Sequence, residues 1–145
     1  MTINFDKYAL TGKEFVNKVA FELGDEKNTS RASSLIRATL HALRDQSSFE
    51  ESMQLLSQLP MFIKAIYVDG WKPGSHKNHF RHLDEFTSAV QKNGGFQECE
   101  NPLEKLHDIQ SVIHVMAEYV DEGEMDDFRK TFPEELRILL ANRAY

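Results

Sequence analysis

The residues best suited to chemistry in this sequence are its six histidines, three of which recur at three-residue spacing. His76, His79 and His82 are followed closely by Asp84 and Glu85. Neutral imidazoles can share a zinc or nickel ion when they lie on one face of a helix, but the third would be rotated by about 120° from the first on an ideal helix. The favoured interpretation is a polar linker with solvated histidines, and a metal site made of these three side chains is the alternative.

Two further histidines lie one helical turn from a carboxylate. His41 is followed four residues later by Asp45, and His114 by Glu118. Side chains at this spacing face each other on a helix, and a carboxylate there favours the protonated imidazole and orients its ring for acid–base chemistry. Because both histidines fall on the polar side of their helices, we expect two surface pairs. The alternative is that the pairs converge between two halves of the molecule.

The remaining reactive groups give weaker signals. Cys99 lies between Glu98 and Glu100, whose negative charge disfavours the thiolate. The acidic run 121–127 lacks the ligand spacing of an EF-hand, because glycine is its third residue. No nucleophile-elbow, P-loop or dinucleotide-binding pattern occurs. We therefore predict no catalytic residue, no metal ligand and no cofactor.

Composition narrows the class of protein further. The chain has 145 residues, 17 Lys and Arg against 23 Asp and Glu, and a net charge of −6. This length supports one domain, and an acidic chain repels nucleic acid and anionic membranes. The first residues lack the pattern of a signal peptide, and no apolar run reaches the roughly 18 residues that span a bilayer. A soluble cytoplasmic protein is expected.

Helices must position these residues, because apolar side chains recur at three- and four-residue spacing almost throughout. The expected fold is all-α, a bundle of about eight helices. Capping boxes at Thr11–Glu14 and Ser48–Glu51 predict two helix starts, and Gly24 is the predicted end of the first helix. The other helices are expected from 28–30 to about 45, over 61–68, from 83 to 93–95, from 102 to about 120, around 125–128, and after Pro133.

Apolar positions within these helices predict a core. In the third helix, Phe49, Met53 and Leu56 share one face and should point inward. Gly123 should end the sixth helix, because glycine is a weak helix former. The segment 69–78 is rich in glycine and proline and is the best candidate for a linker.

The second half of the sequence repeats the first. At an offset of 71, Glu14-Phe15 matches Glu85-Phe86 and Gly24 matches Gly95, and at an offset of 73 residues 36–43 match 109–116 and Leu59-Pro60 matches Phe132-Pro133. We predict two tandem four-helix repeats, about 11–71 and about 82–145, which share one core because neither is large enough to build its own. The net charge is carried by the second half: residues 1–73 have 9 basic and 9 acidic side chains, and residues 74–145 have 8 and 14.

Two segments carry a resemblance to a known family. Residues 37–45 and 58–71, with Glu50-Glu51 between them, resemble a bacterial family described only as domain of unknown function 2267. The matched positions include Gln58-Leu59-Pro60, Tyr67 and Gly70-Trp71. The resemblance covers nearly the whole chain, more closely in its first half. It implies an all-helical fold and brings no activity, cofactor or catalytic residue.

Tyr67 and Trp71 are the aromatic residues within this resemblance. An aromatic pair at a helix end usually packs the following turn against the core, and an anchor for a partner is the alternative.

These observations favour a single all-helical domain, residues 1–145, that acts as a non-enzymatic interaction or scaffold protein with a protein partner or as a homo-oligomer. A charge-selective partner would be basic and would bind the acidic second half. Two alternatives stay open. One is a metal- or small-ligand-binding protein that uses His76, His79 and His82, and the other is an enzyme with a pocket between the repeats, near His41 or His114.

Overall fold

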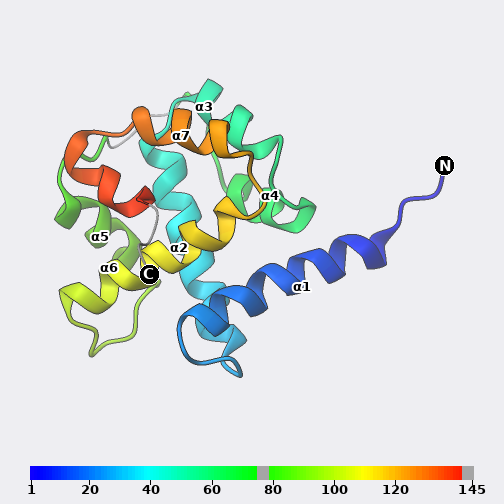
Figure 1. The fold of residues 1–145 in the computed structure, drawn as a ribbon, viewed down its shortest axis with the longest axis horizontal. Helices are drawn as coiled ribbons and strands as arrows, with labels where there is room; N and C mark the ends of the chain where they lie inside the picture. Colours follow the sequence, from blue (N-terminus) through cyan, green and yellow to red (C-terminus); the bar gives the residue numbers. More distant parts are fainter. Residues whose placement is uncertain (75–78, 142–145) are drawn as a thin grey trace.

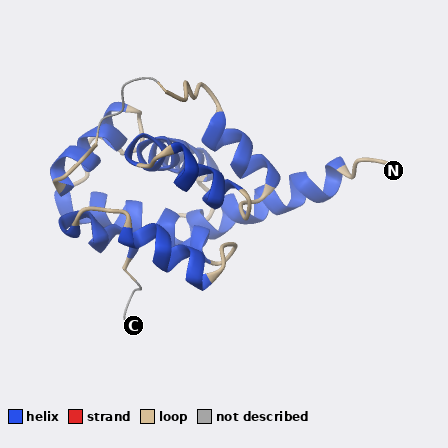
Figure 2. Cartoon of the chain, turned by 90° about the horizontal axis from the view of Figure 1, so that it is seen from above, coloured by secondary structure: helices blue, strands red, loops and turns tan. Residues whose placement is uncertain are grey.

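Helices follow one another along the whole of the described chain, so the predicted all-α fold is confirmed. The computed structural model describes residues 1–74 and 79–141, and within these ranges it has eight helices and no strand (Figure 2). In chain order they are α1 (Phe5–Glu22), α2 (Thr29–Gln46), α3 (Phe49–Leu56), α4 (Met61–Val68), α5 (Leu83–Lys92), α6 (Pro102–Ala117), α7 (Glu122–Lys130) and the 3₁₀-helix η1 (Glu134–Leu140).

The second helix, α2, lies at the centre of the molecule (Figure 1) and contacts α1, α4, α5 and α6. Ten of its side chains are buried: Ala32, Leu35, Ile36, Ala38, Thr39, Leu40, Ala42, Leu43, Arg44 and Gln46. Only a narrow stripe that includes Ser30, Ser33 and Arg37 stays exposed, so α2 is a core element with one polar edge. The other helices therefore pack around α2.

The first helix begins at Phe5, so the predicted start after Thr11 is wrong. The side chain of Asn4 accepts a hydrogen bond from the backbone N–H of Lys7 at 3.0 Å and so caps the helix. Thr11 lies inside the helix, and its hydroxyl donates to the carbonyl of Lys7 at 3.0 Å. The Thr-x-x-Glu pattern occurs here within a helix, because a stronger cap precedes it.

This early start leaves the first turns of α1 with little cover. The buried residues of α1 are Gly12, Phe15, Val19 and Ala20, so none precedes Gly12. Its first half projects beyond the rest of the molecule (Figure 1). With a rise of about 1.5 Å per residue, the whole helix is about 27 Å long. The projecting part is named the α1 arm, residues 1–11.

The third helix differs from its predicted orientation. Phe49 and Met53 are 50% and 39% exposed, whereas Ser52, Leu55 and Leu56 are buried. The inward orientation of the first two is therefore wrong. The predicted cap is correct, because the hydroxyl of Ser48 and the carboxylate of Glu51 each bond the backbone N–H of the other residue.

Gly123 does not end a helix as predicted. It lies in the first turn of α7, where its N–H donates to the side chain of Asp121 at 2.9 Å. The preceding helix, α6, already ends at Ala117. Glycine is tolerated in the first turn because that N–H has no partner within the helix and takes one from the cap.

The two halves contact each other through corresponding helices. Between the halves, the contact of α1 with α6 has its counterpart in the contact of α5 with α2. Within the halves, the contact of α2 with α4 has its counterpart in the contact of α6 with η1. This pattern supports the predicted duplication, which stays a prediction. The match at the ends of α1 and α5 needs correction, because the glycines with left-handed backbones are Gly24 (φ 73°) and Gly94 (φ 81°). Gly95 is therefore not the structural counterpart of Gly24.

Gly95 instead lets the loop after α5 approach α2. A Cβ atom at this position would lie 2.8 Å from Cβ of Ala38 and 2.7 Å from Cγ1 of Val90. Both distances are shorter than van der Waals contact, so no larger side chain fits unless α2 and α5 move.

We predict that Gly95→Ala destabilises the protein by about 1–3 kcal/mol, because the added methyl group overpacks this contact. Chemical denaturation measures the change. Gly123→Ala is the matched control: its Cβ would meet only the side chain of Asp121, at 3.2 Å, and alanine is the better helix former. Equal stability of the Gly95→Ala variant and the wild type would contradict the close approach.

Candidate functional site

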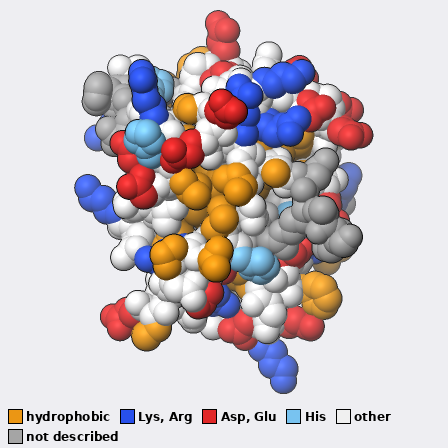
Figure 3. Space-filling view, turned by 60° about the vertical axis from the view of Figure 1, so that its left-hand side comes forward, with side chains coloured by type: hydrophobic (Ala, Val, Ile, Leu, Met, Phe, Trp, Pro, Cys, Tyr) orange, Lys and Arg blue, Asp and Glu red, His pale blue; other side chains and the backbone are white. Residues whose placement is uncertain are grey.

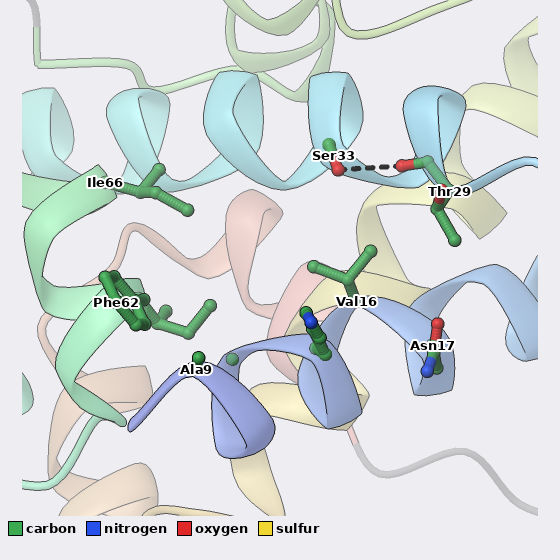
Figure 4. A pocket seen from close by; sticks show the side chains of 10 residues that line it. Ala9, Val16, Asn17, Thr29, Ser33, Phe62 and Ile66 are labelled. Carbon is green, nitrogen blue, oxygen red and sulfur yellow. Dashed lines mark hydrogen bonds between the residues drawn. The ribbon is translucent and has the colours of Figure 1, made fainter. Parts of the chain in front are cut away.

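An apolar groove of about 540 Å³ runs between α1, α2 and α4. Figure 4 shows Phe62 and Ile66 of α4 at one end, Val16 of α1 in the middle, and Asn17, Thr29 and Ser33 at the other end. The groove therefore changes from apolar beside α4 to polar at the start of α2. Its volume falls within the usual range of ligand-binding sites, about 300–1,000 Å³. The lining residues are Ala9, Gly12, Lys13, Val16, Asn17, Thr29, Ser33, Phe62, Ile63 and Ile66.

One glycine of α1 sets the width of this groove. Gly12 is buried, and a Cβ atom there would lie 3.3 Å from Cβ of Phe62. The phenyl ring of Phe62 thus packs directly on the backbone of α1. It still leaves 44% of its surface exposed, so an apolar ring remains available on the wall of the groove.

The α4 wall is held in place by two arginines of α2. The buried Arg44 donates through Nη1 to the carbonyls of Tyr67 at 3.0 Å and Asp69 at 2.9 Å. Arg37 pairs with the carboxylate of Asp69 at 2.7 Å. The last carbonyls of a helix have no partner within it and are stabilised by cations. These contacts join the two segments that carry the family resemblance, so both segments serve to position α4.

His41 belongs to the same face of α2 and also holds α4. Its Nε2 donates to the carbonyl of Ile66 at 2.8 Å, and burial lowers the pKa of this half-buried imidazole. The predicted surface pair with Asp45 is wrong, because Asp45 instead lies 3.7 Å from Nε of Arg44. His41 therefore acts as a neutral donor within the packing of α2 against α4.

The aromatic residues of the resemblance pack the turn after α4. Tyr67 is fully buried, its hydroxyl lies 2.8 Å from Oγ of Ser52, and burial raises its pKa to about 12. Trp71 meets Tyr67 edge to face at 6.1 Å and stacks on Phe49 at 5.6 Å. Trp71 also packs against the core, as predicted, and its role as a partner anchor stays a hypothesis.

His114 contacts the other half of the molecule rather than its own helix. Its Nδ1 lies 2.5 Å from Oε1 of Glu22 in α1. Glu118 is instead directed toward Lys18, with 4.0 Å between its Oε1 and Nζ of the lysine. The predicted pair of His114 with Glu118 is therefore wrong. His114 also lines a cavity of about 270 Å³ beside α7. Because His41 contacts α4 and His114 contacts α1, the two histidines serve different interfaces.

The three-histidine hypothesis is tested only in part. His76 lies outside the described residues, His79 is exposed, and Nδ1 of His82 lies 3.3 Å from Glu135, which raises the pKa of His82. Within residues 1–74 and 79–141, no group of three His, Cys, Asp or Glu side chains is placed to hold a metal ion.

Sequence reasoning missed a buried ionic network between the halves. Nη2 of Arg31 in α2 lies 3.0 Å from Glu100 and 3.5 Å from Asp108 of α6. Asp108 is 4% exposed, and burial together with the Glu100 carboxylate raises its pKa to about 8. The partners are 69 and 77 residues apart in the chain, so no local spacing signals their contact.

Exposed apolar side chains are concentrated in the first half. Among the described residues, the large ones in the second half are Leu103 and Ile138. Figure 3 shows the side turned away from the α1 arm, with an apolar patch in the middle and charged side chains around it. In the first half, the large apolar side chains that stay exposed are Met1, Ile3, Phe5, Leu10, Phe21, Phe49, Met53, Met61, Phe62 and Val68. The groove therefore lies in the half with more exposed apolar surface.

The fold and groove define an all-helical protein organised around one buried helix. Residues 12–139 match the model of the family described as uncharacterized conserved protein, DUF2267. The match covers most of the chain, so the protein belongs to this family and the predicted resemblance is confirmed. The search of curated proteins finds no match. Within the part of the chain that the structure describes, no helix is both long and apolar enough to cross a membrane.

We predict that His41→Gln weakens the loss of stability in mild acid. The folded state lowers the pKa of His41, so the unfolded chain binds the proton more tightly and the wild type is destabilised as the pH falls from 7 to 5.5. Glutamine keeps a donor for Ile66 but does not titrate. Denaturation at both pH values should show a smaller loss for the variant, and parallel losses would contradict the neutral-donor role.

Asp108→Asn should have the opposite pH signature. Burial and the Glu100 carboxylate raise the pKa of Asp108 in the folded state, so the folded protein binds a proton that the unfolded chain has released, and wild-type stability declines as the pH rises from 5 to 8. The variant should lack this decline and exceed the wild type at pH 8. Asp126→Asn, in an exposed pair with Arg129, is the control. A variant profile that parallels the wild type would reject the buried proton.

Proposed function

We propose that this protein is a non-enzymatic interaction module that binds an amphipathic helix in the groove between α1, α2 and α4. The observation that carries the proposal is the apolar wall of Val16, Phe62 and Ile66, which lies beside a groove of about 540 Å³. Helix-in-groove recognition needs an apolar channel that accepts side chains at i, i+3, i+4 and i+7.

The surroundings of the groove favour a helix over a small ligand. Met61 and Phe62 of α4 are 46% and 44% exposed. Apolar surface therefore continues beyond the groove, and continuous apolar patches mark interaction sites on soluble proteins. Asn17 at the polar end and Lys13, which also lines the groove, offer hydrogen bonds that would set the direction of the bound helix.

The two alternative functions have less support. The metal-binding alternative depends on His76, which lies outside the described residues. The enzyme alternative depends on a pocket near His41 or His114, but His41 donates to the carbonyl of Ile66 and the imidazole of His114 is engaged with Glu22 of α1. The groove is supported independently by its volume, its apolar lining and the exposed side chains beside it.

A peptide titration followed by NMR tests the proposal. The probe is an 18-residue helix of Leu, Ala, Glu and Lys with one apolar face, and the control peptide has the same composition in scrambled order. We expect amide shifts at the lining residues with the amphipathic peptide alone. Val16→Lys should weaken binding at least about tenfold, because it replaces a half-buried apolar side chain of the groove wall with a charged one. Val68→Lys, an exposed position of α4 that does not line the groove, should leave the affinity unchanged.

Shifts confined to the turn of Phe49 and Trp71, or to the patch in Figure 3, would contradict the proposal. Equal binding by the Val16→Lys variant and the wild type would also contradict it.

A further inference from the structure

We infer that the helix bound in the groove is the α1 arm of a second copy of this chain, in a symmetric dimer. This inference rests on the proposed function and names its partner. The arm projects into solvent from the helix that forms one wall of the groove (Figure 1). Each copy therefore offers both an apolar helix and a groove.

The arm has the apolar surface that such a contact needs. Ile3, Phe5 and Leu10 are 58%, 69% and 69% exposed, and Met61 and Phe62 beside the groove are 46% and 44% exposed. Of these, Phe5 shares the helix face of Ala9, Gly12 and Val16 that lines the groove, and Phe62 lies on the α4 wall.

The face of α1 that lines the groove continues into the arm. Phe5, Ala9, Gly12 and Val16 are spaced by four, three and four residues and so share a face. If two α1 helices cross between Ala9 and Leu10, residue pairs whose numbers sum to 19 lie opposite each other.

The same register also pairs opposite charges. Asp6 and Lys13 sum to 19, lie seven residues apart on α1, and are both exposed. Neither forms an ion pair with any described residue. The twofold axis would place Asp6 of each copy against Lys13 of the other, at the polar part of the groove that Lys13 lines. The Asp6–Lys13 contact then occurs twice.

The symmetry of this arrangement limits its size. The same surface is used on both copies, so the interface is isologous and closes at two subunits. Both arms are covered and both grooves are filled. We therefore expect a dimer rather than a fibre or a ring.

Sedimentation of the full chain from 1 to 500 µM at low salt tests the inference by charge reversal. The wild type should dimerise. Asp6→Lys and Lys13→Asp should each weaken dimerisation at least tenfold, because each places like charges in contact twice. A one-to-one mixture of the two variants should dimerise like the wild type, since every contact then joins opposite charges. Both positions are exposed, and circular dichroism should show unchanged folding.

A wild type that stays monomeric at 500 µM overturns the inference. A dimer that neither reversal weakens also overturns it, because the subunits then meet elsewhere. The proposed function is judged separately by the peptide titration: a monomer whose groove still binds the amphipathic peptide refutes the dimer alone, and a monomer that binds no peptide refutes both.

Discussion

The burial of α2 is the constraint on which the rest of the structure depends. A helix covered over most of its surface brings polar groups into the core, and these groups need partners. Arg44 and His41 find theirs in the last carbonyls of α4, and Arg31 finds its partners in Glu100 and Asp108 of the second half. The same helix therefore fixes the position of α4 and joins the two halves of the chain.

The groove follows from this arrangement. Because α2 holds the C-terminal turn of α4, Phe62 of α4 is directed against the backbone of Gly12 in α1. No residue of α1 before that point is buried, and the arm is mostly exposed. Val16 and Ile66 then line a channel that the chain does not fill. The family match begins at Gly12, so most of the groove lies within the matched region and the arm precedes it.

Helical periodicity and capping patterns predict the number and order of the helices, because both depend on neighbouring residues. The cap at Ser48 and Glu51 formed as predicted, whereas the pattern at Thr11 failed because Asn4 caps α1 earlier. Side-chain partners were predicted poorly. His114 bonds Glu22, 92 residues away, and Arg31 bonds residues of the second half. Such contacts depend on helix packing, and the groove likewise needs three helices to be placed before it can be recognised.

The central claim is that the uncovered arm of α1 is a binding element whose partner is the groove of another copy. Amide hydrogen exchange of residues 5–11, measured at a low and a high protein concentration, tests it most directly. The account predicts that protection of these amides rises with concentration, while amides of the buried α2 exchange at an unchanged rate. Equally fast exchange of the arm at both concentrations would contradict the claim.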